Sequence, residues 1–325
     1  MYAILQSTTG GRETLAWQRC ERPQPQAHQL LVRVRAAGVN RADIVQREGR
    51  YPAPAGDSPI LGLELAGEVV AIGQDVTGFA IGDAVFGLVG GGAYAEYAVL
   101  DAACAIHKPE ALTWAQAASL PEAWMTAWFN VVEIAQLQAG ESLLVHAGAS
   151  GVGSAAIQLA NWLGATAFTT VGSAEKQAYC QALGAKCAVN YHEEDFSSVL
   201  RTQGRVNVVL DCIGGAYLKQ NFSVLANDGR LIVIGLMGGA KTEIDLGLLL
   251  MKRIRLMGST LRAQPLAVKA RLSTALAQNI VPAILAQNLQ LTVDRCFALS
   301  EAAEAHDYME RNANLGKIVL VHTPE

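Results

Sequence analysis

The chain has 325 residues, of which 51% are hydrophobic and 17% charged, and its formal net charge at pH 7 is −4. This length fits two domains rather than one, and the composition excludes a disordered chain. The acidic balance and the lack of a Lys/Arg cluster argue against nucleic acid as a partner.

The sequence carries no recognisable targeting or membrane segment. Its first residues lack the basic start and long apolar run of a signal peptide, and no apolar run reaches the roughly 18 residues of a membrane span. The six cysteines are scattered and never form a CxxC pair, which argues against a disulfide framework and a zinc ribbon. We therefore expect a reduced, cytoplasmic protein without a membrane partner.

Residues 1–121 are predicted to form a β-rich domain. Apolar and polar residues alternate over 30–36 and over 93–99, as in half-buried strands. The short apolar runs 69–72 and 84–86 are separated by turn residues and predict further strands.

Residues 122–260 show a different pattern, in which short apolar runs alternate with segments of helical periodicity. Continuous apolar strands between amphipathic helices predict a parallel sheet that is covered on both faces. The predicted strands are 143–147, 167–171, 206–211 and 230–234, and the predicted helices are 151–163 and 174–183.

Residues 261–325 hold two predicted helices, over 265–279 and 300–312, and a closing strand over 317–321. This strand can return to the first domain, which would make that domain discontinuous.

A glycine-rich turn follows the first strand of the α/β domain, with the sequence His-Ala-Gly-Ala-Ser-Gly-Val-Gly over residues 146–153. Set against the pattern GxGxxG, it places Gly148, Ser150 and Gly153 at the three glycine positions. Small residues there allow the backbone to approach a pyrophosphate, and the N-terminus of the following helix supplies N–H donors. Its position between a strand and a helix favours a dinucleotide site over an ordinary tight turn.

The end of the next strand indicates which dinucleotide is bound. It carries no acidic residue to meet a free ribose 2′-hydroxyl. Ser173 offers a hydroxyl and Lys176 a cation suited to a 2′-phosphate, and Tyr191 could close over the same group. A solvated helix face is the alternative for Lys176, and Glu175 conflicts with the assignment unless it faces solvent. The pattern predicts NADPH rather than NADH.

An ordered set of motifs runs along nearly the whole chain. The motifs are 38–43, 47–51, 60–64, 82–83, 121–127, the glycine turn, 211–215, 235–239 and 317–320. With them, the chain resembles the zinc-independent quinone oxidoreductases of the medium-chain dehydrogenase/reductase superfamily. The resemblance is to the zeta-crystallin subgroup, and within it most to the tumour-suppressor-inducible type.

The resemblance implies an α/β fold with two parts. Residues 122–260 would form a Rossmann NADPH-binding domain with a doubly wound parallel sheet. Residues 1–121 would form a GroES-like catalytic domain, which residues 261–325 partly complete. It further implies an active site in the cleft between the domains, and a homodimer or homotetramer commonly joined through the Rossmann sheet.

The resemblance also implies site residues. It places Asn40, Tyr51 and Thr126 near the nicotinamide, as candidate catalytic residues that also contact the cofactor. The other cofactor contacts that it implies are Ala147, Gly148, Ala149, Ser150, Gly151, Val152, Gly153, Gly172, Ser173, Lys176, Tyr191, Gly235, Leu236, Met237, Ser259, Thr260 and Leu261.

Zinc alcohol dehydrogenases share this fold, and their catalytic zinc needs Cys and His or Glu ligands. In this chain Asn40 occupies the place of the first Cys, and Leu63 stands where the His would be. No cysteine falls near Met125, where the second Cys would lie. We therefore expect no metal.

Without a metal ion to polarise its carbonyl group, the acceptor must be able to take a hydride unaided, as a quinone can. An alkene conjugated to a carbonyl is the other plausible acceptor. Tyr51 and Asn40 are hypothesised to hydrogen-bond the acceptor carbonyl or to order the water that protonates it. The alternatives are a Tyr51 that only packs in a proline-rich loop and an Asn40 that only caps a helix. Glu64 is interpreted as the anchor of an internal network and His146 as a core residue.

The predicted function is NADPH-dependent reduction of a quinone. The rival functions are an alkenal or enoyl-thioester reductase on the same scaffold, and a non-catalytic NADPH-binding or RNA-binding protein. The sequence leaves open the physiological acceptor, one- or two-electron transfer, the oligomeric state, and whether Tyr51 acts chemically or only positions the substrate.

Overall fold

The computed structural model describes residues 1–322, which divide into two compact units. Unit 1 comprises Met1–Met125, Leu261–Gln287 and the chain from Leu291 onward, and unit 2 comprises Thr126–Thr260 and Asn288–Gln290. An α/β unit with a parallel sheet and a second, β-rich unit match the predicted fold class. The two units are described separately.

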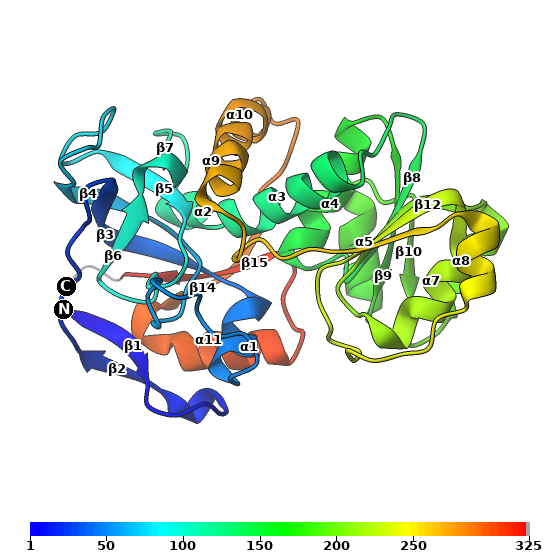
Figure 1. Cartoon of the computed structure of the whole chain (residues 1–325), viewed down its shortest axis with the longest axis horizontal. Helices are drawn as coiled ribbons and strands as arrows, with labels where there is room; N and C mark the ends of the chain where they lie inside the picture. The colour runs from blue at the N-terminus through cyan, green and yellow to red at the C-terminus, as the bar shows by residue number, and fades with distance from the viewer. Residues whose placement is uncertain (323–325) are drawn as a thin grey trace. The chain divides into compact units, whose positions relative to one another are not determined.

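Unit 2 contains a six-stranded parallel sheet with the strand order β10-β9-β8-β11-β12-β13 (Figure 1). Parallel pairing is expected here because each strand is a short apolar run that is followed by a helix. The strands are β8 (Ser142–His146), β9 (Thr166–Val171), β10 (Cys187–Asn190), β11 (Val206–Asp211), β12 (Leu225–Val233) and β13 (Arg255–Gly258).

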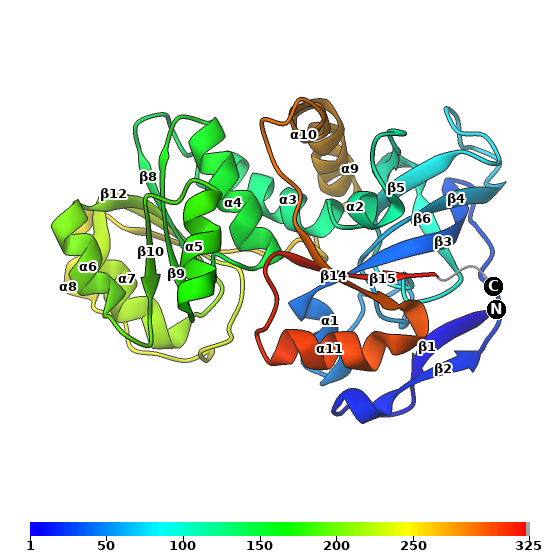
Figure 2. The same cartoon turned by 180° about the vertical axis from the view of Figure 1, so that it is seen from behind.

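Helices cover the sheet of unit 2 on both faces (Figure 2). They are α4 (Gly151–Trp162), α5 (Ala174–Ala182), α6 (Phe196–Gln203), α7 (Leu218–Val224) and α8 (Leu246–Lys252), with the π-helix η3 (Phe129–Ile134) and the short 3-10 helix η4 (Gly215–Tyr217). Phe196 and Phe222 of α6 and α7 pack with Leu144, Val209 and Leu231 of three strands in one apolar cluster. The strands β8 to β11 are thus mostly buried, as their apolar sequences require, whereas β12 has exposed residues in its first half and β13 is largely exposed.

Unit 1 contains a seven-stranded sheet with the order β14-β15-β3-β4-β5-β7, in which β6 also pairs with β3. The strands are β3 (Gln29–Val39), β4 (Glu64–Ile72), β5 (Ala84–Leu88), β6 (Tyr97–Asp101), β7 (Ala105–His107), β14 (Val293–Ala298) and β15 (Lys317–Val321), beside the separate ribbon of β1 (Tyr2–Gln6) and β2 (Leu15–Arg19). The closing strand β15 pairs antiparallel with β3, so the first and last parts of the chain share one sheet (Figure 1).

The helices of unit 1 come from all three of its segments. They are α1 (Arg41–Arg47), α2 (Trp114–Ala118), α9 (Leu266–Ala275), α10 (Val281–Leu285) and α11 (Ala302–Glu310), with the short helices η1 (Arg12–Thr14), η2 (Ala102–Cys104), η5 (Leu276–Ile280) and η6 (Leu299–Glu301). Helix α3 (Pro121–Trp128) contains the unit boundary, between Met125 and Thr126. Ala302, Ala305 and Met309 of α11 pack against Leu65 and Leu100 of the sheet.

The unit boundaries differ from the predicted domain boundaries at two short segments, 122–125 and 288–290. Specific hydrogen bonds hold each segment in the unit where it lies. Residues 122–125 belong to unit 1, where the N–H of Glu122 donates to Glu64 Oε2 at 2.8 Å. Asn288–Gln290 belong to unit 2, where Gln290 exchanges two hydrogen bonds with the side chain of Gln158, at 2.7 and 3.1 Å.

Several predicted elements have different extents in the structure; β4 and β12, for example, each begin five residues before the predicted strand. The strand predicted over 93–99 begins only at Tyr97 and runs to Asp101, because Tyr94 and its neighbours turn inward to bond the backbone of Ile4 and Leu61. The predicted helix over 265–279 passes from α-helix into the π-helix η5 after Ala275. Among the described residues, every helix is too short or too polar to cross a bilayer.

Candidate functional site

The predicted cofactor residues of unit 2 lie at one edge of its sheet. The glycine turn follows β8, Gly172 follows β9, Tyr191 follows β10, Gly235 lies just beyond β12, and Ser259 follows β13. Because all these strands are parallel, their carboxyl ends meet at the same edge. This edge is where open α/β sheets bind their ligands.

The glycine turn has the geometry of a strand-to-helix phosphate loop. Ala147 adopts a left-handed backbone conformation, with φ at 55°, and its carbonyl accepts from the N–H of Ser150 at 2.9 Å. Ser150 caps helix α4, and its hydroxyl oxygen accepts from the N–H of Gly153 at 3.0 Å. The turn thus directs the positive end of the α4 dipole at the sheet edge, where an anion would be stabilised.

Two glycines of this turn have no room for a side chain. A Cβ atom on Gly148 would lie 2.0 Å from Thr169 Oγ1, and one on Gly153 would lie 2.4 Å from the carbonyl oxygen of Ala147. The backbone at Gly148 therefore packs closely on Thr169 of β9, and the backbone at Gly153 packs closely on residues 147 and 148 of the same turn. Glycine at these two positions keeps the turn compact, which fits the close approach of a pyrophosphate to its backbone.

The residues predicted to meet a 2′-phosphate come together after β9 and β10. Ser173 caps helix α5, and its hydroxyl oxygen accepts from the N–H of Lys176 at 3.2 Å. The hydroxyl of Tyr191 lies across Gly172, where a Cβ would be 2.6 Å away. Glu175 is exposed. The only acidic residue in the first turn of α5 is thus directed at solvent, as the NADPH prediction requires.

Other predicted cofactor residues follow the last two strands of this sheet: Gly235, Leu236 and Met237 after β12, and Ser259 and Thr260 after β13, whereas Leu261 belongs to unit 1. The N–H of Met237 donates to the carbonyl of Cys212 at 3.2 Å, and that of Ser259 donates to Val233 at 3.0 Å. The hydroxyl of Ser259 is buried and has no hydrogen-bond partner within residues 1–322. Thr126 is buried, and its carbonyl accepts from Asn130 Nδ2 at 2.8 Å. An unpartnered buried hydroxyl at this edge fits a bound polar group.

His146 lies in the core of unit 2 rather than at its edge. Its Nδ1 is 2.9 Å from Thr170 Oγ1, and its Nε2 is 2.8 Å from Asn221 Oδ1. Burial lowers the pKa of His146, more than the charge of Asp211 raises it. The His146 imidazole is thus neutral and has a hydrogen-bond partner at each ring nitrogen. This agrees with the interpretation of His146 as a core residue.

In unit 1, Asn40 belongs to a buried ionic cluster around Glu64. Glu64 Oε1 accepts from Asn40 Nδ2 at 2.9 Å and from Lys317 Nζ at 2.6 Å. Lys317 Nζ also donates to Asn40 Oδ1 at 2.6 Å and to the carbonyl of Val39 at 3.0 Å. We call Asn40, Glu64 and Lys317 the Glu64 cluster. It confirms Glu64 as the anchor of an internal network.

The contacts of Asn40 are compatible with both of its predicted roles. Asn40 occupies the N-cap position of α1 and forms a capping box with Asp43. In this box the carboxylate of Asp43 accepts from the backbone N–H of Asn40, at 2.8 Å. The Asn40 amide is held by Glu64 and Lys317, and a primary amide has two N–H donors, so the second one remains for another acceptor.

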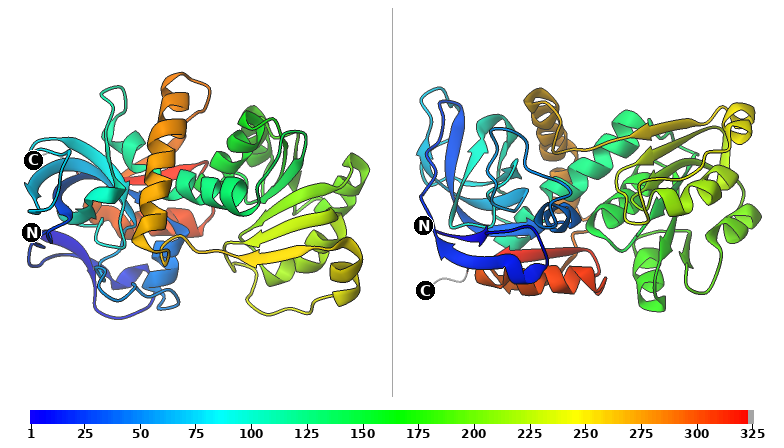
Figure 3. Two further views of the ribbon diagram at one scale, coloured as in Figure 1. Left: turned by 45° about the horizontal axis from the view of Figure 1, so that its top comes forward. Right: turned by 60° about the horizontal axis from the view of Figure 1, so that its bottom comes forward.

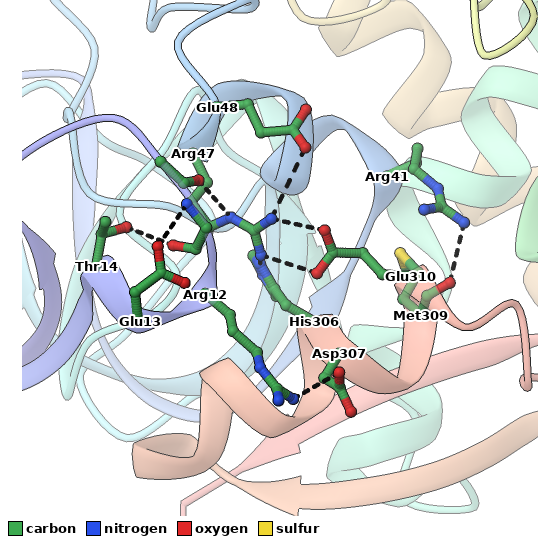
Figure 4. Close-up of polar contacts among 12 residues, drawn as sticks. Arg12, Glu13, Thr14, Arg41, Arg47, Glu48, His306, Asp307, Met309 and Glu310 are labelled. Carbon is green, nitrogen blue, oxygen red and sulfur yellow. Dashed lines mark hydrogen bonds and ion pairs between the residues drawn. The ribbon is translucent and has the colours of Figure 1, made fainter.

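Asp43 connects α1 to a buried chain of polar groups. Its Oδ2 accepts from Tyr94 Oη at 3.0 Å, and Tyr94 Oη lies 3.2 Å from His306 Nε2. His306 Nδ1 lies 3.3 Å from Arg47 Nη1, and Arg47 pairs with Glu310 at 2.7 Å (Figure 4). Arg47 can only donate, so His306 accepts at Nδ1 and donates from Nε2. Burial raises the pKa of Asp43 to about 6.

Tyr51 lies beside a residue that the sequence analysis did not single out, Arg262. The guanidinium carbon of Arg262 is 5.6 Å from the centre of the Tyr51 ring. Burial first, and then the charge of Glu122, raise the pKa of Tyr51, while Arg262 lowers it. The Tyr51 hydroxyl therefore stays protonated at neutral pH and can act as a hydrogen-bond donor.

Three residues near Asn40 and Tyr51 were missed as site residues: Glu122, Arg262 and Lys317. Glu122 gave a usable signal, because it is a charged residue in the otherwise apolar motif 121–127. Lys317 begins an apolar strand, so its charge was also out of place. Arg262 could not be found from spacing, because its partners lie 172 to 216 residues earlier in the chain. Within residues 1–322, no three His, Cys, Asp or Glu side chains gather as a metal site would require.

Two protein families match parts of the chain. Residues 26–110 match the alcohol dehydrogenase GroES-like domain, and residues 151–278 match the family described as zinc-binding dehydrogenase. The matched regions fall in unit 1 and mainly in unit 2, respectively.

Solved structures of similar proteins match over the whole chain. Quinone oxidoreductase from Pseudomonas syringae pv. Tomato DC3000 is 31% identical, with a TM-score of 0.87, and the match covers 98% of this chain and 99% of that one. Escherichia coli quinone oxidoreductase, complexed with NADPH, is 28% identical, with a TM-score of 0.89 and coverage of 99% and 100%. CurK enoyl reductase is 27% identical, with a TM-score of 0.86 and coverage of 99% for both chains.

The matching curated proteins are much longer than this chain. One subunit of the phenolphthiocerol/phthiocerol polyketide synthase of Mycobacterium tuberculosis (strain ATCC 25618 / H37Rv) is 31% identical over 318 residues. The match covers 96% of this chain but 14% of that protein. The chain thus spans only a small part of the length of such relatives.

Proposed function

Because the chain belongs to the medium-chain dehydrogenase/reductase superfamily, we propose that it is an NADPH-dependent quinone oxidoreductase. The observation that carries the proposal is the whole-length match to quinone oxidoreductases, which includes both units and has 31% identity for the Pseudomonas syringae protein. The narrower resemblance to the tumour-suppressor-inducible type and a cytoplasmic location are part of the proposal and rest on the sequence.

NADPH is the proposed cofactor, and the residues of unit 2 supply its binding site. The glycine turn would hold the pyrophosphate with backbone N–H groups, and Ser173, Lys176 and Tyr191 would surround the 2′-phosphate. The Ser259 hydroxyl, which lacks a partner among residues 1–322, would take a polar group of the nicotinamide half. When bound, NADPH supplies a hydride, which is the chemistry that the protein alone does not have.

The residues of unit 1 would act on the acceptor. Tyr51 keeps its proton, so its hydroxyl can donate to a carbonyl oxygen, and the second N–H of Asn40 can do the same. The Glu64 cluster holds the Asn40 amide in one orientation. These residues would thus orient a carbonyl. A quinone needs little further activation, because its reduced product is aromatic, so orientation is the main contribution that it requires from the protein.

We propose that the reaction needs no zinc, because Asn40 and Leu63 stand at positions where zinc enzymes of this fold have Cys and His. The test is the activity of the purified protein before and after chelation. Activity that disappears on chelation and returns with added zinc would overturn this part of the proposal.

The main test of the function is NADPH oxidation with a panel of acceptors, with NADH as the control. The panel contains 9,10-phenanthrenequinone, a trans-2-enoyl thioester and an enal. We expect the highest kcat/KM with the quinone and with NADPH. A clear preference for the thioester would instead establish the second candidate below, and binding of NADPH without any turnover would indicate a non-catalytic protein.

The second candidate is an enoyl-thioester or alkenal reductase, with NADPH as the same cofactor. It is favoured by the whole-length match to CurK enoyl reductase and by the match to a polyketide synthase among the curated relatives. Both candidates need a carbonyl to be held while a conjugated carbon accepts a hydride. The residues named above therefore serve either reaction, and only the acceptor panel separates them.

We also propose a homodimer that joins through β13, the edge strand of the sheet in unit 2 (Figure 3). An edge strand offers unpaired backbone groups to a second copy. The neighbouring helix α8 exposes Leu246, Leu250 and Met251, which are 68%, 75% and 74% exposed. Exposed apolar side chains beside an open edge are typical of an interface.

A further inference from the structure

Arg262 is a buried arginine, and one nitrogen of its guanidinium group, Nη2, lacks a hydrogen-bond partner among the described residues. The side chain is 4% exposed, and its Nε donates to the carbonyl of Gly90 at 2.8 Å. Its Nη1 donates to Gln46 Oε1 at 2.7 Å and to the carbonyl of Tyr51 at 3.4 Å. Its Nη2 is buried and has no hydrogen-bond partner in the described part of the chain. Leaving a buried charged donor unpaired is costly, so this atom indicates a missing acceptor.

The orientation of Arg262 is fixed by its other contacts. Gln46, which accepts from Nη1, is itself held by a hydrogen bond from its Nε2 to the carbonyl of Pro59, at 3.0 Å. Three acceptors thus hold Nε and Nη1 of the guanidinium group, and Nη2 keeps a set direction without a partner of its own among the described residues. A rigid donor of this kind is suited to an oxygen that gains charge during a reaction.

Glu122 is a partly buried residue that also carries a buried polar atom without a partner within residues 1–322. Its Oε2 is buried without a hydrogen-bond partner among the residues that the structure describes. Glu64 and Asp43 add negative charge around it, and Lys317 and Arg262 add positive charge. Burial, and then the charge of Glu64, raise the pKa of Glu122 to about 8. At neutral pH the Glu122 carboxyl therefore holds a proton that no residue nearby accepts.

Both groups lie in the surroundings of Tyr51. Glu122 and Arg262 are the two charged residues that influence the Tyr51 hydroxyl, and they also influence each other. Neither bonds the other through its unsatisfied atom. The two charged residues that act on the Tyr51 hydroxyl thus each carry a buried polar atom without a partner among the described residues, Arg262 Nη2 and Glu122 Oε2.

We propose that Arg262 and Glu122 bind and protonate the acceptor oxygen, with Arg262 Nη2 donating a hydrogen bond to it and the Glu122 carboxyl giving it a proton. This inference rests on the proposed function. It assigns the ligand as a conjugated carbonyl compound, such as a quinone, whose oxygen becomes a phenolate or enolate on reduction.

The step balances in atoms and electrons. For a quinone, the hydride that NADPH supplies forms an O–H bond on one carbonyl oxygen, and an electron pair moves through the conjugated ring to the other oxygen, which Arg262 holds. The O–H bond of Glu122 breaks, and a second O–H bond forms on that other oxygen, so that the acceptor leaves as the hydroquinone. Glu122 remains as a carboxylate beside Arg262 and Lys317 until water returns the proton, and NADPH becomes NADP⁺.

The first experiment tests Arg262 without turnover. The full-length protein is titrated with 4-nitrophenol near pH 7 in the absence of NADPH, and the absorbance of the phenolate reports binding. We expect the wild type to bind the phenolate and to lower the pKa of the bound phenol. Arg262→Gln should bind it at least about 10-fold more weakly, since a charged hydrogen bond is lost. Equal binding by both proteins would overturn the role of Arg262.

A matched control separates this role from a structural one. Arg47 is as buried as Arg262, but its guanidinium is paired with Glu310 and with the carbonyl of Gly10. Arg47→Lys should lower the thermal midpoint and leave 4-nitrophenolate binding unchanged. If Arg262→Gln does not fold, Arg262→Met replaces it, because methionine keeps an unbranched apolar side chain and has no N–H donor, and wild-type affinity in this variant would equally overturn the proposal.

The second experiment tests Glu122 with 9,10-phenanthrenequinone as the acceptor. Glu122→Gln keeps the size of the side chain and breaks no side-chain hydrogen bond among residues 1–322. We expect kcat to fall by about 100-fold, the usual contribution of a general acid. The wild-type rate should also decline above about pH 8, as Glu122 loses its proton, and this decline should be absent in the variant. An unchanged kcat with the same pH profile would overturn the role of Glu122.

The two proposals fail in different ways. If the wild type reduces quinones and neither variant differs from it, the proposed function stands and this inference is wrong. If the wild type reduces no quinone but loses 4-nitrophenolate binding on Arg262→Gln, the proposed function is wrong and the oxygen site stands.

Discussion

Single atoms explain why several residues of the site have the identity they have. In the Glu64 cluster, the carboxylate lies so close to β3 that a Cβ on Gly38 would be 2.0 Å from Glu64 Oε1. Lys317 uses its three N–H donors on Val39, Asn40 and Glu64. A buried ion pair is tolerated only when its hydrogen bonds are satisfied in this way. The Asn40 amide is therefore fixed by a residue 277 positions further along the chain.

At this scale, Lys176 tests the choice of cofactor. Lys176→Ala should raise the KM for NADPH by about 10- to 100-fold, because a charged contact to the 2′-phosphate is lost. The KM for NADH should stay the same. Steady-state kinetics with both cofactors measure the effect, and Lys219→Ala, an exposed lysine of α7, is the control. An equal change for NADPH and NADH would remove Lys176 from the 2′-phosphate site.

Gly148 tests the packing of the glycine turn. Gly148→Ala should lower the free energy of unfolding by about 1–3 kcal/mol, because its Cβ would overlap with Thr169 Oγ1. It should also weaken NADPH binding, since the turn must move away from β9. Urea denaturation and fluorescence titration measure the two effects. Gly258→Ala, where a Cβ meets nothing within 4 Å, should be close to neutral. A Gly148→Ala protein as stable as the wild type would contradict the close packing.

At the scale of elements, the α/β unit was the more predictable one. Its strands are continuous apolar runs and its helices have caps in the sequence, so β8, β9, β11, α4 and α5 fell within a residue of the predicted ends. In unit 1, patterns of alternation are interrupted by residues that serve tertiary contacts. Tyr94 is such a residue, because its hydroxyl bonds Asp43 and its ring packs on His306. No local pattern carries that information.

The same difference applies to the candidate site. The glycine turn, Ser173 and Tyr191 could be found from the sequence, because each follows a strand of a regular βα repeat. Arg262 and Lys317 could not be assigned, because their partners come from distant parts of the chain and depend on how three segments combine in unit 1. Residue spacing predicts sites on one element and its loop, and tertiary packing decides the others.

Helix α8 and strand β13 test the proposed dimer. Replacing both Leu250 and Met251 with Glu should convert the dimer to a monomer, because two charges would be buried at the interface. Light scattering after size-exclusion chromatography measures the mass. Ile81→Glu is the control, since Ile81 is also highly exposed, at 71%, but lies in unit 1. A double variant that keeps the wild-type mass would exclude this surface as the interface.

At the scale of the whole molecule, the buried polar chain of unit 1 predicts how stability depends on pH. Burial, and then Arg47 and Arg41, lower the pKa of His306 from 6.5 to about 3. The unfolded chain therefore binds a proton at His306 before the folded protein does. The stability that His306 contributes is complete above about pH 6.5 and is lost as the pH falls toward 3. Asp43, whose pKa is raised to about 6, has the opposite effect between pH 3.8 and 6.

His306→Gln isolates the histidine contribution, because glutamine keeps a donor and an acceptor but does not titrate. We expect the variant to be less stable than the wild type at neutral pH and to lose less stability on acidification. Urea midpoints across the range from pH 7 to pH 4 measure both. A parallel decline in the two proteins would show that His306 is not the group responsible.

The position of β15 has a consequence for how the protein is made. Unit 2 is nearly continuous in sequence, so a ribosome delivers almost all of it in one stretch. Strand β15 can join the sheet of unit 1 only after Lys317 and the residues that follow it have been synthesised. Until then, the part of β3 that pairs with β15 has no partner strand, and Glu64 lacks its ion pair with Lys317. Unit 1 therefore becomes complete only after the segments of unit 2 have been made, and during that delay part of β3 lacks its partner strand.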